Sequence, residues 1–130
     1  MYDVCWIRSM GIKINGEIVD TMIAASLVNE NRYRYDLGSL GWDYLGQGKN
    51  EFDLTTAAKE WGLDAKADMW KLPAMYVGNY AERDAELTFN LWKEMTKEIW
   101  SQDLESIFIL ERDLFPCLVD MRFLGVRVDG

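Results

Sequence analysis

The chain has 130 residues and is about half apolar, with six Trp, six Tyr and five Phe, a composition typical of a globular domain. Its net charge of −8 argues against tight non-specific binding to duplex DNA, which depends on Lys and Arg. The chain contains no histidine, which excludes Ser–His and Cys–His catalysis and histidine-ligated zinc. Any catalysis must therefore use Asp, Glu, Tyr, Lys or a bound metal ion.

Neither a thiolate metal site nor a membrane segment is expected. Cys5 and Cys117 lie far apart without a CxxC pair, which favours two reduced thiols in a cytoplasmic protein. Residues 1–12 do not have the pattern of a signal peptide. No stretch approaches the ~18 apolar residues that a membrane span needs.

The pattern of caps, breakers and apolar residues predicts a mostly helical chain. Asp20 and Asp36 are suited to cap the starts of two helices, and Gly11 and Gly62 to follow the ends of two others. In chain order we expect helices over residues 2–10, 21–30, 37–45, 51–61, 80–102 and 104–124, strands over 17–19 and 126–130, and irregular backbone over 63–78 that Gly78 interrupts. Pro116 predicts a kink or a restart in the last helix.

The helix expected over residues 80–102 carries a carboxylate in an unusual place. Asn79 and Glu82 have the spacing of an N-cap pair, which predicts the helix start. An inward stripe at helical spacing follows, formed by Tyr80, Leu87, Leu91 and Met95. Asp84 lies four residues after Tyr80 and so faces the same side as this stripe.

A carboxylate on a core face is costly unless it is paired or bound to a metal ion. One interpretation of Asp84 is a salt bridge to a neighbouring Arg or Lys. A similar interpretation makes Asp3, which follows Tyr2, the cap of the first helix. The alternative is that both aspartates are metal ligands, and these residues by themselves leave the choice open.

Several stretches, in this order, resemble the 3′–5′ proofreading exonuclease domain of family A DNA polymerases, the DNA polymerase I type. Tyr2-Asp3 is similar to the end of the second exonuclease motif, and Tyr80 with Asp84 to the Tyr-x-x-x-Asp third motif. "DTM" at 20–22 and "L…YLG" at 40–46 resemble the intervening helices. The stretch "LERDLFPCLVDMRFLGVRVD" resembles the junction that leads into the polymerase body.

The resemblance implies an α/β fold of the ribonuclease H-like type and a site with two divalent metal ions, Mg²⁺ or Mn²⁺. Two such ions about 4 Å apart stabilise both the attacking and the leaving oxygen. It implies that Asp84 is a ligand of one ion, that Asp3 holds the other, partly through water, and that Tyr80 orients the attacking water. The implied partners are a single-stranded or frayed DNA 3′ end and the remainder of a polymerase chain, in a bacterial or virus-infected cell.

One part of the family pattern is missing. The first motif, Asp-x-Glu on the opening strand, does not precede Tyr2, and later aspartates lie in the wrong part of the fold: Asp36, Asp43, Asp53, Asp64 and Asp68. We therefore expect a helix-rich fragment that lacks its N-terminal strands and is inactive alone. Residues 1–102 are the expected C-terminal part of the exonuclease domain, and 103–130 the start of the polymerase domain.

Two other functions stay open. An RNase D-like exonuclease, acting on RNA 3′ ends, shares the Tyr-x-x-x-Asp motif, although the stretch after residue 103 argues against it. A non-catalytic, exonuclease-like scaffold is the second alternative, and the presence of Asp3, Tyr80 and Asp84 argues against it. The residues do not decide between a bacterial and a viral source.

Overall fold

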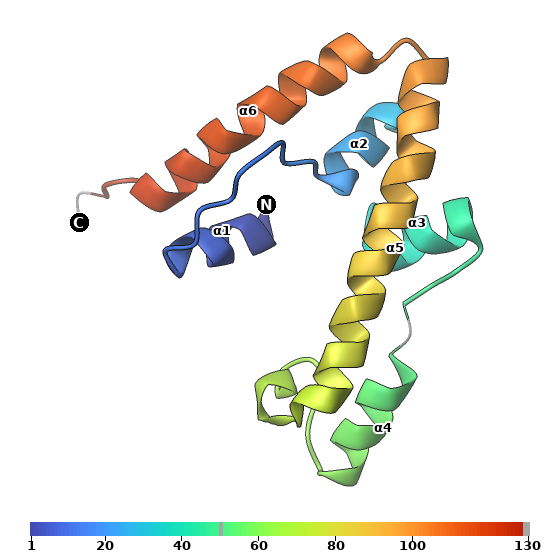
Figure 1. The fold of residues 1–130 in the computed structure, drawn as a ribbon, viewed down its shortest axis with the longest axis vertical. Helices are drawn as coiled ribbons and strands as arrows, with labels where there is room; N and C mark the ends of the chain where they lie inside the picture. Colours follow the sequence, from blue (N-terminus) through green and yellow to red (C-terminus); the bar gives the residue numbers. More distant parts are fainter. Residues whose placement is uncertain (50, 129–130) are drawn as a thin grey trace.

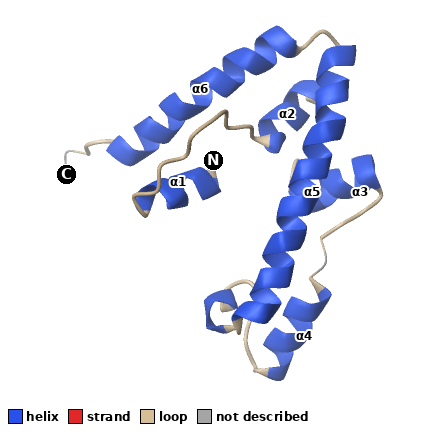
Figure 2. Ribbon diagram, in the orientation of Figure 1, coloured by secondary structure: helices blue, strands red, loops and turns tan. Residues whose placement is uncertain are grey.

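The computed structural model describes residues 1–49 and 51–128, and within these ranges it contains helices and no strand (Figures 1 and 2). The elements are α1 (Tyr2–Ser9), α2 (Thr21–Val28), α3 (Leu37–Leu45), α4 (Phe52–Glu60), the 3-10 turn η1 (Met69–Lys71), α5 (Ala74–Ser101) and α6 (Glu105–Leu124). The prediction of a mostly helical chain is therefore confirmed.

Both strand predictions are wrong for the part of the chain that the structure describes. Residues 17–19 connect α1 to α2 without strand pairing, and residues 126–128 follow α6 in the same way. A strand needs a neighbouring strand to satisfy its backbone groups, and residues 1–49 and 51–128 contain no strand that could pair with either segment. Asp129 and Gly130, the end of the second expected strand, lie outside the described residues.

Helix α5 is the spine of the molecule (Figure 1). Helices α2 and α3 pack on it, α4 lies at its N-terminal end, and α6 turns back from its C-terminal end. The main hydrophobic cluster joins α2, α3, α5 and α6 and contains Ala24, Ala25, Leu40, Leu91, Met95, Ile99 and Phe108. Of the predicted apolar stripe of α5, Leu87, Leu91 and Met95 are buried and Tyr80 is half-buried, and Ile99 extends the stripe by one turn.

The start of α5 differs from the sequence expectation. Pro73 is its N-cap, so Asn79 lies inside the helix and caps nothing, and Gly78 does not interrupt it. Proline suits this place because the first N–H groups of a helix have no partner within it. Gly78 costs the helix only about 1 kcal/mol relative to alanine, which the packing of the 28-residue helix outweighs.

The other boundary predictions follow the capping rules. Asp20 accepts a hydrogen bond from the Met22 backbone N–H at 2.9 Å, and Asp36 accepts one from the Ser39 N–H at 3.1 Å. Gly46 ends α3 with a φ of 63°, in the left-handed region where glycine has no side-chain penalty.

Helix α6 continues through Pro116 without a restart. Phe115 and Val119 flank the proline and are almost fully buried, so packing on both sides holds the helix together. Helix α1 lies beside α6, where Arg8 forms an ion pair with Asp120 and stacks over the Phe123 ring at 4.7 Å. These contacts attach the N-terminal helix to the end of the chain.

Candidate active site

Helix α5 places Tyr80 and Asp84 one turn apart on the same side. Both side chains line a cleft of about 820 Å³, which we call the α5 cleft. Its wall is completed by side chains from four other parts of the chain: Asp3, Val19, Thr21, Leu37 and Lys49. The structure therefore brings together Asp3, Tyr80 and Asp84, the three residues that the sequence predicted for one site, although their roles stay predictions.

The two oxygens of the Asp84 carboxylate have different surroundings. The Lys49 ammonium donates a hydrogen bond to Oδ2 at 2.7 Å and a second one to the Tyr80 hydroxyl at 3.1 Å. The other oxygen, Oδ1, is buried and has no hydrogen-bond partner among residues 1–49 and 51–128. Because a buried oxygen without a partner is destabilising, Asp84 retains the capacity to bind one more donor or cation.

Lys49 is charged under all ordinary conditions. Burial by itself lowers the pKa of this ammonium, but the hydrogen bonds to Asp84 and Tyr80 and the negative charge of Asp84 outweigh it. The pKa of Lys49 consequently lies above its usual value. The side chains of Lys49 and Asp84 are about one-quarter exposed, at 27% and 23%, so the pair is only partly screened by water.

Asp3 reaches the cleft from the first turn of α1 and is exposed. The N-cap of α1 is Met1, and no side chain caps the helix, so the interpretation of Asp3 as a cap is wrong. The Met1 ammonium instead binds Asp20 at 2.8 Å. Asp3 thus stands at the cleft as the acidic residue in the first turn of α1, where its charge also interacts favourably with the helix dipole.

The donor chemistry fits a hard divalent cation, although the ligand set is incomplete. The acidic side chains that line the cleft are Asp3 and Asp84, and no described residue donates a hydrogen bond to Asp84 Oδ1. Oxygen ligands of this kind suit Mg²⁺ and Mn²⁺. Residues 1–49 and 51–128 contain no group of three or more Asp, Glu or Cys side chains arranged to hold a metal ion.

Four aspartates that follow Tyr2 in the chain form local hydrogen bonds or ion pairs: Asp36, Asp43, Asp64 and Asp68. Asp36 caps α3, and hydrogen bonds from the Ser39 hydroxyl and N–H, with a contribution from Arg34, hold its pKa below the usual value. Asp43 pairs with Arg32. None of the five aspartates Asp36, Asp43, Asp53, Asp64 and Asp68 lines the α5 cleft.

Sequence reasoning missed Lys49. It predicted that a neighbouring Arg or Lys could pair with Asp84, but the partner lies 35 residues away in the chain. Lys49 follows the Gly46–Gln47–Gly48 break after α3, and no periodicity marks it. Only the packing of α3 on α5 brings this segment to the cleft.

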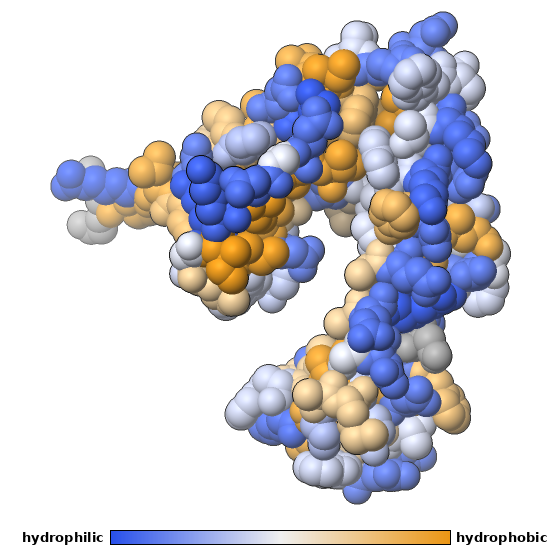
Figure 3. All heavy atoms as spheres, viewed as in Figure 1, coloured by the Kyte–Doolittle hydropathy of each residue, from blue (hydrophilic) through white to orange (hydrophobic). Residues whose placement is uncertain are grey.

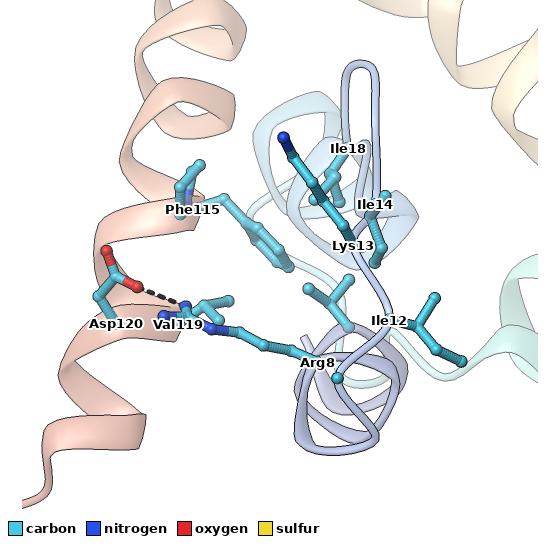
Figure 4. A pocket seen from close by; sticks show the side chains of 11 residues that line it. Arg8, Ile12, Lys13, Ile14, Ile18, Phe115, Val119 and Asp120 are labelled. Atoms are coloured by element: carbon cyan, nitrogen blue, oxygen red, sulfur yellow. Dashed lines mark hydrogen bonds and ion pairs between the residues drawn. The ribbon is translucent and has the colours of Figure 1, made fainter.

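A second pocket, of about 390 Å³, lies between α1, residues 11–18 and α6 (Figure 4). Its wall is mainly apolar, with Ile12, Ile14, Ile18, Phe115 and Val119, and the Arg8–Asp120 ion pair lies at its edge (Figure 4). Hydrophobic side chains also gather on the surface over α1 (Figure 3). The carboxylate that lines this pocket, Asp120, is already paired with Arg8, so the pocket has little capacity for metal or acid–base chemistry.

No helix in the described part of the chain is long and apolar enough to cross a membrane. Comparison with protein families gives a match to the model described as 3′–5′ exonuclease, of the DNA polymerase A type, over residues 2–100. The matched range contains all three predicted site residues.

Three relatives from phages match nearly the whole chain. A DNA-directed DNA polymerase of Pseudomonas phage M6 is 37% identical over 130 residues, which cover 98% of this chain and 20% of the relative. The DNA polymerases DpoZ of Acinetobacter phage SH-Ab 15497 and Vibrio phage phiVC8 are 33% and 32% identical, over 98% and 92% of this chain and 22% of each relative. The chain thus spans about one-fifth of the length of the relatives it matches.

Proposed function

We propose that this chain is part of a proofreading exonuclease within a longer phage DNA polymerase. The chain belongs to the 3′–5′ exonuclease domain family of family A DNA polymerases. One observation carries the proposal. Tyr80 and Asp84, at the spacing of the family's third motif, line an open cleft in which Asp84 Oδ1 lacks a partner. An ordinary structural aspartate would have both oxygens satisfied.

In the proposed reaction, the cleft binds the 3′ end of a DNA strand and the terminal nucleotide leaves as a 5′-monophosphate. Two divalent ions, Mg²⁺ or Mn²⁺, when bound, supply charge stabilisation to the attacking and leaving oxygens. Asp84 would hold one ion through Oδ1, and Asp3 would hold the other, partly through water. The Tyr80 hydroxyl would accept a hydrogen bond from the attacking water and orient it.

Asp3 and Asp84 alone are too few ligands for two ions. We propose that the Asp-x-Glu pair of the family lies in the longer chain, on strands that complete a ribonuclease H-like sheet around these helices. The one-fifth coverage of the relatives supports this view. We place the boundary to the polymerase domain at residues 102–103, where a turn between α5 and α6 puts Asp103 at a φ of 54°.

The proposed substrate is DNA, and the proposed parent activity is DNA-directed DNA synthesis in an infected bacterial cell. The printed names of the relatives, all DNA polymerases from phages, support this choice over an RNase D-like enzyme. The acidic chain also fits a frayed single strand that is held at a metal centre better than duplex readout.

One observation favours a second candidate, the non-catalytic scaffold. Asp84 already has a counter-ion in Lys49, at 2.7 Å, as expected for a structural salt bridge. In this alternative the domain would position the polymerase without hydrolysing DNA. The unsatisfied Oδ1 and the unengaged Asp3 argue for the exonuclease.

The experiment is a substrate comparison with the full-length polymerase. Single-stranded DNA and RNA of the same sequence, labelled at the 5′ end, are incubated with the enzyme in Mg²⁺ without nucleotides. We expect shortening of the DNA from its 3′ end, with 5′-monophosphates as products. Preferential shortening of the RNA would favour the RNase D-like enzyme, and no shortening of either substrate would favour the scaffold.

A further inference from the structure

The α5 cleft contains one basic side chain among the described residues that line it, Lys49. Its ammonium lies 2.7 Å from Asp84 Oδ2 and 3.1 Å from the Tyr80 hydroxyl, and 5.4 Å from the centre of the Tyr80 ring. Lys49 therefore contacts both third-motif side chains at once. Neither the family match nor the relatives assign it a role.

We propose that Lys49 is a positioning residue of this site, a built-in counter-ion that holds Asp84 and Tyr80 in place without metal and competes with a divalent ion for Asp84. The inference rests on the proposed function. The reason is the position of the Lys49 ammonium, which contacts the Asp84 carboxylate that would bind the ion.

Charge repulsion opposes simultaneous binding of Lys49 and a divalent ion to the Asp84 carboxylate. An ion on Oδ1 and an ammonium on Oδ2 are attached to the same carboxylate, so two positive groups stand within a few ångströms of each other. The pair is only partly exposed, and water screens this repulsion weakly. Binding of the ion therefore requires the Lys49 ammonium to leave Asp84.

The mobility of the lysine side chain makes this exchange feasible. Lys49 lies in the segment between α3 and α4, and a lysine reaches its partner through a flexible four-carbon stem. Because Lys49 is not part of α5, its ammonium can turn away without moving that helix. The exchange would keep Asp84 neutralised at every stage.

The test measures Mn²⁺ binding to the full-length polymerase from the electron paramagnetic resonance signal of free Mn²⁺. Asp84→Asn identifies the site in question, because all other Mn²⁺ sites persist in this variant. In Lys49→Gln we expect the Asp84-dependent site to bind Mn²⁺ about tenfold more tightly than in the wild type, within the usual range of such couplings. Lys49→Arg, which keeps the positive charge, should bind Mn²⁺ like the wild type.

Two controls separate this role from a purely structural one. Lys97→Gln removes the same charge and a salt bridge to Glu94 on the exposed side of α5, and it should not change Mn²⁺ affinity. If Lys49→Gln does not fold, Lys49→Met keeps the apolar stem and carries the same expectation. A structural lysine would lower the stability of the protein when removed but would not tighten the metal site.

The possible failures are distinguishable. Unchanged or weaker Mn²⁺ binding at the Asp84-dependent site in Lys49→Gln would overturn the competition while leaving the metal site in place. Absence of any Asp84-dependent Mn²⁺ binding in the wild type would overturn the proposed metal site, and this inference with it.

Discussion

At the scale of single residues, Asp36 and Asp84 differ in how completely their carboxylate oxygens are hydrogen-bonded, and this difference separates a structural aspartate from a candidate functional one. Asp36 is satisfied by Ser39 and Arg34 and stabilises a helix start. Asp84 has one oxygen paired and one left without a partner. Incomplete satisfaction of a buried polar atom is uncommon in folded proteins and is the local feature that points to function.

Asp36→Ala should lower the free energy of unfolding by about 1 kcal/mol at pH 7, because it removes the cap of α3. The pKa of Asp36 is lowered in the folded state, so its contribution is present above its unfolded value of 3.8 and is lost as the pH falls through the folded value. Urea unfolding at pH 7 and at progressively lower pH checks this.

The matched control for that measurement is Asp43→Ala, in the same helix, which removes a surface ion pair with Arg32. Its cost at pH 7 should be no more than a few tenths of a kcal/mol. Equal costs for the two variants would contradict the capping role of Asp36.

At the scale of elements, two helical glycines, Gly78 and Gly41, differ in the space around them. A methyl group added at Gly78, inside α5, would meet no atom within 4 Å, whereas one at Gly41 would lie 2.5 Å from the Gln47 backbone oxygen and 3.0 Å from Leu87. The first glycine is a weak point of the helix, and the second allows α3 to approach α5.

Gly78→Ala should therefore raise the free energy of unfolding by about 0.5–1 kcal/mol, since alanine loses less backbone entropy in a helix. Gly41→Ala should lower it, because a backbone oxygen cannot move aside as a side chain can. Thermal unfolding followed by circular dichroism distinguishes the two, and a loss of stability in Gly78→Ala would contradict the account of α5.

The sequence predicted the elements well where a local signal exists and poorly where the decision is made by packing. Asp20, Asp36 and Gly62 marked helix ends correctly because capping is local chemistry. The start of α5 was misplaced by six residues because Gly78 and Asn79 are unfavourable locally, whereas their neighbours Val77 and Tyr80 pack against a second hydrophobic cluster beside the helix. The shared face of Tyr80 and Asp84 was predictable from their i, i+4 spacing, whereas the approach of Lys49 was not, since it depends on the fold.

At the scale of the whole molecule, one long helix organises most of the other helices, and α1 packs on α6 instead. Helices α2, α3, α4 and α6 each contact α5, and the main hydrophobic cluster follows its buried stripe (Figure 2). The same helix carries Tyr80 and Asp84 on its N-terminal half. Site and core therefore share one rigid element, which is a favourable arrangement for precise placement of ligands.

Leu91→Ala tests this organisation. Leu91 is fully buried at the centre of the cluster, so the truncation should cost about 2–5 kcal/mol through lost burial and the cavity it leaves. Leu110→Ala, at a position that is 61% exposed on α6, should cost far less. Chemical denaturation of both variants provides the comparison, and similar costs would contradict the description of α5 as the spine.

The central claim, that Asp84 belongs to an exonuclease metal site, is tested most directly by the 3′-end shortening of single-stranded DNA in Mg²⁺. The measurement compares the full-length polymerase with its Asp84→Ala variant and with Glu86→Ala, a control at an exposed position of the same helix. We predict that Asp84→Ala loses the degradation and that Glu86→Ala retains it. Degradation that survives in a folded Asp84→Ala protein would contradict the account and return Asp84 to an ordinary salt bridge with Lys49.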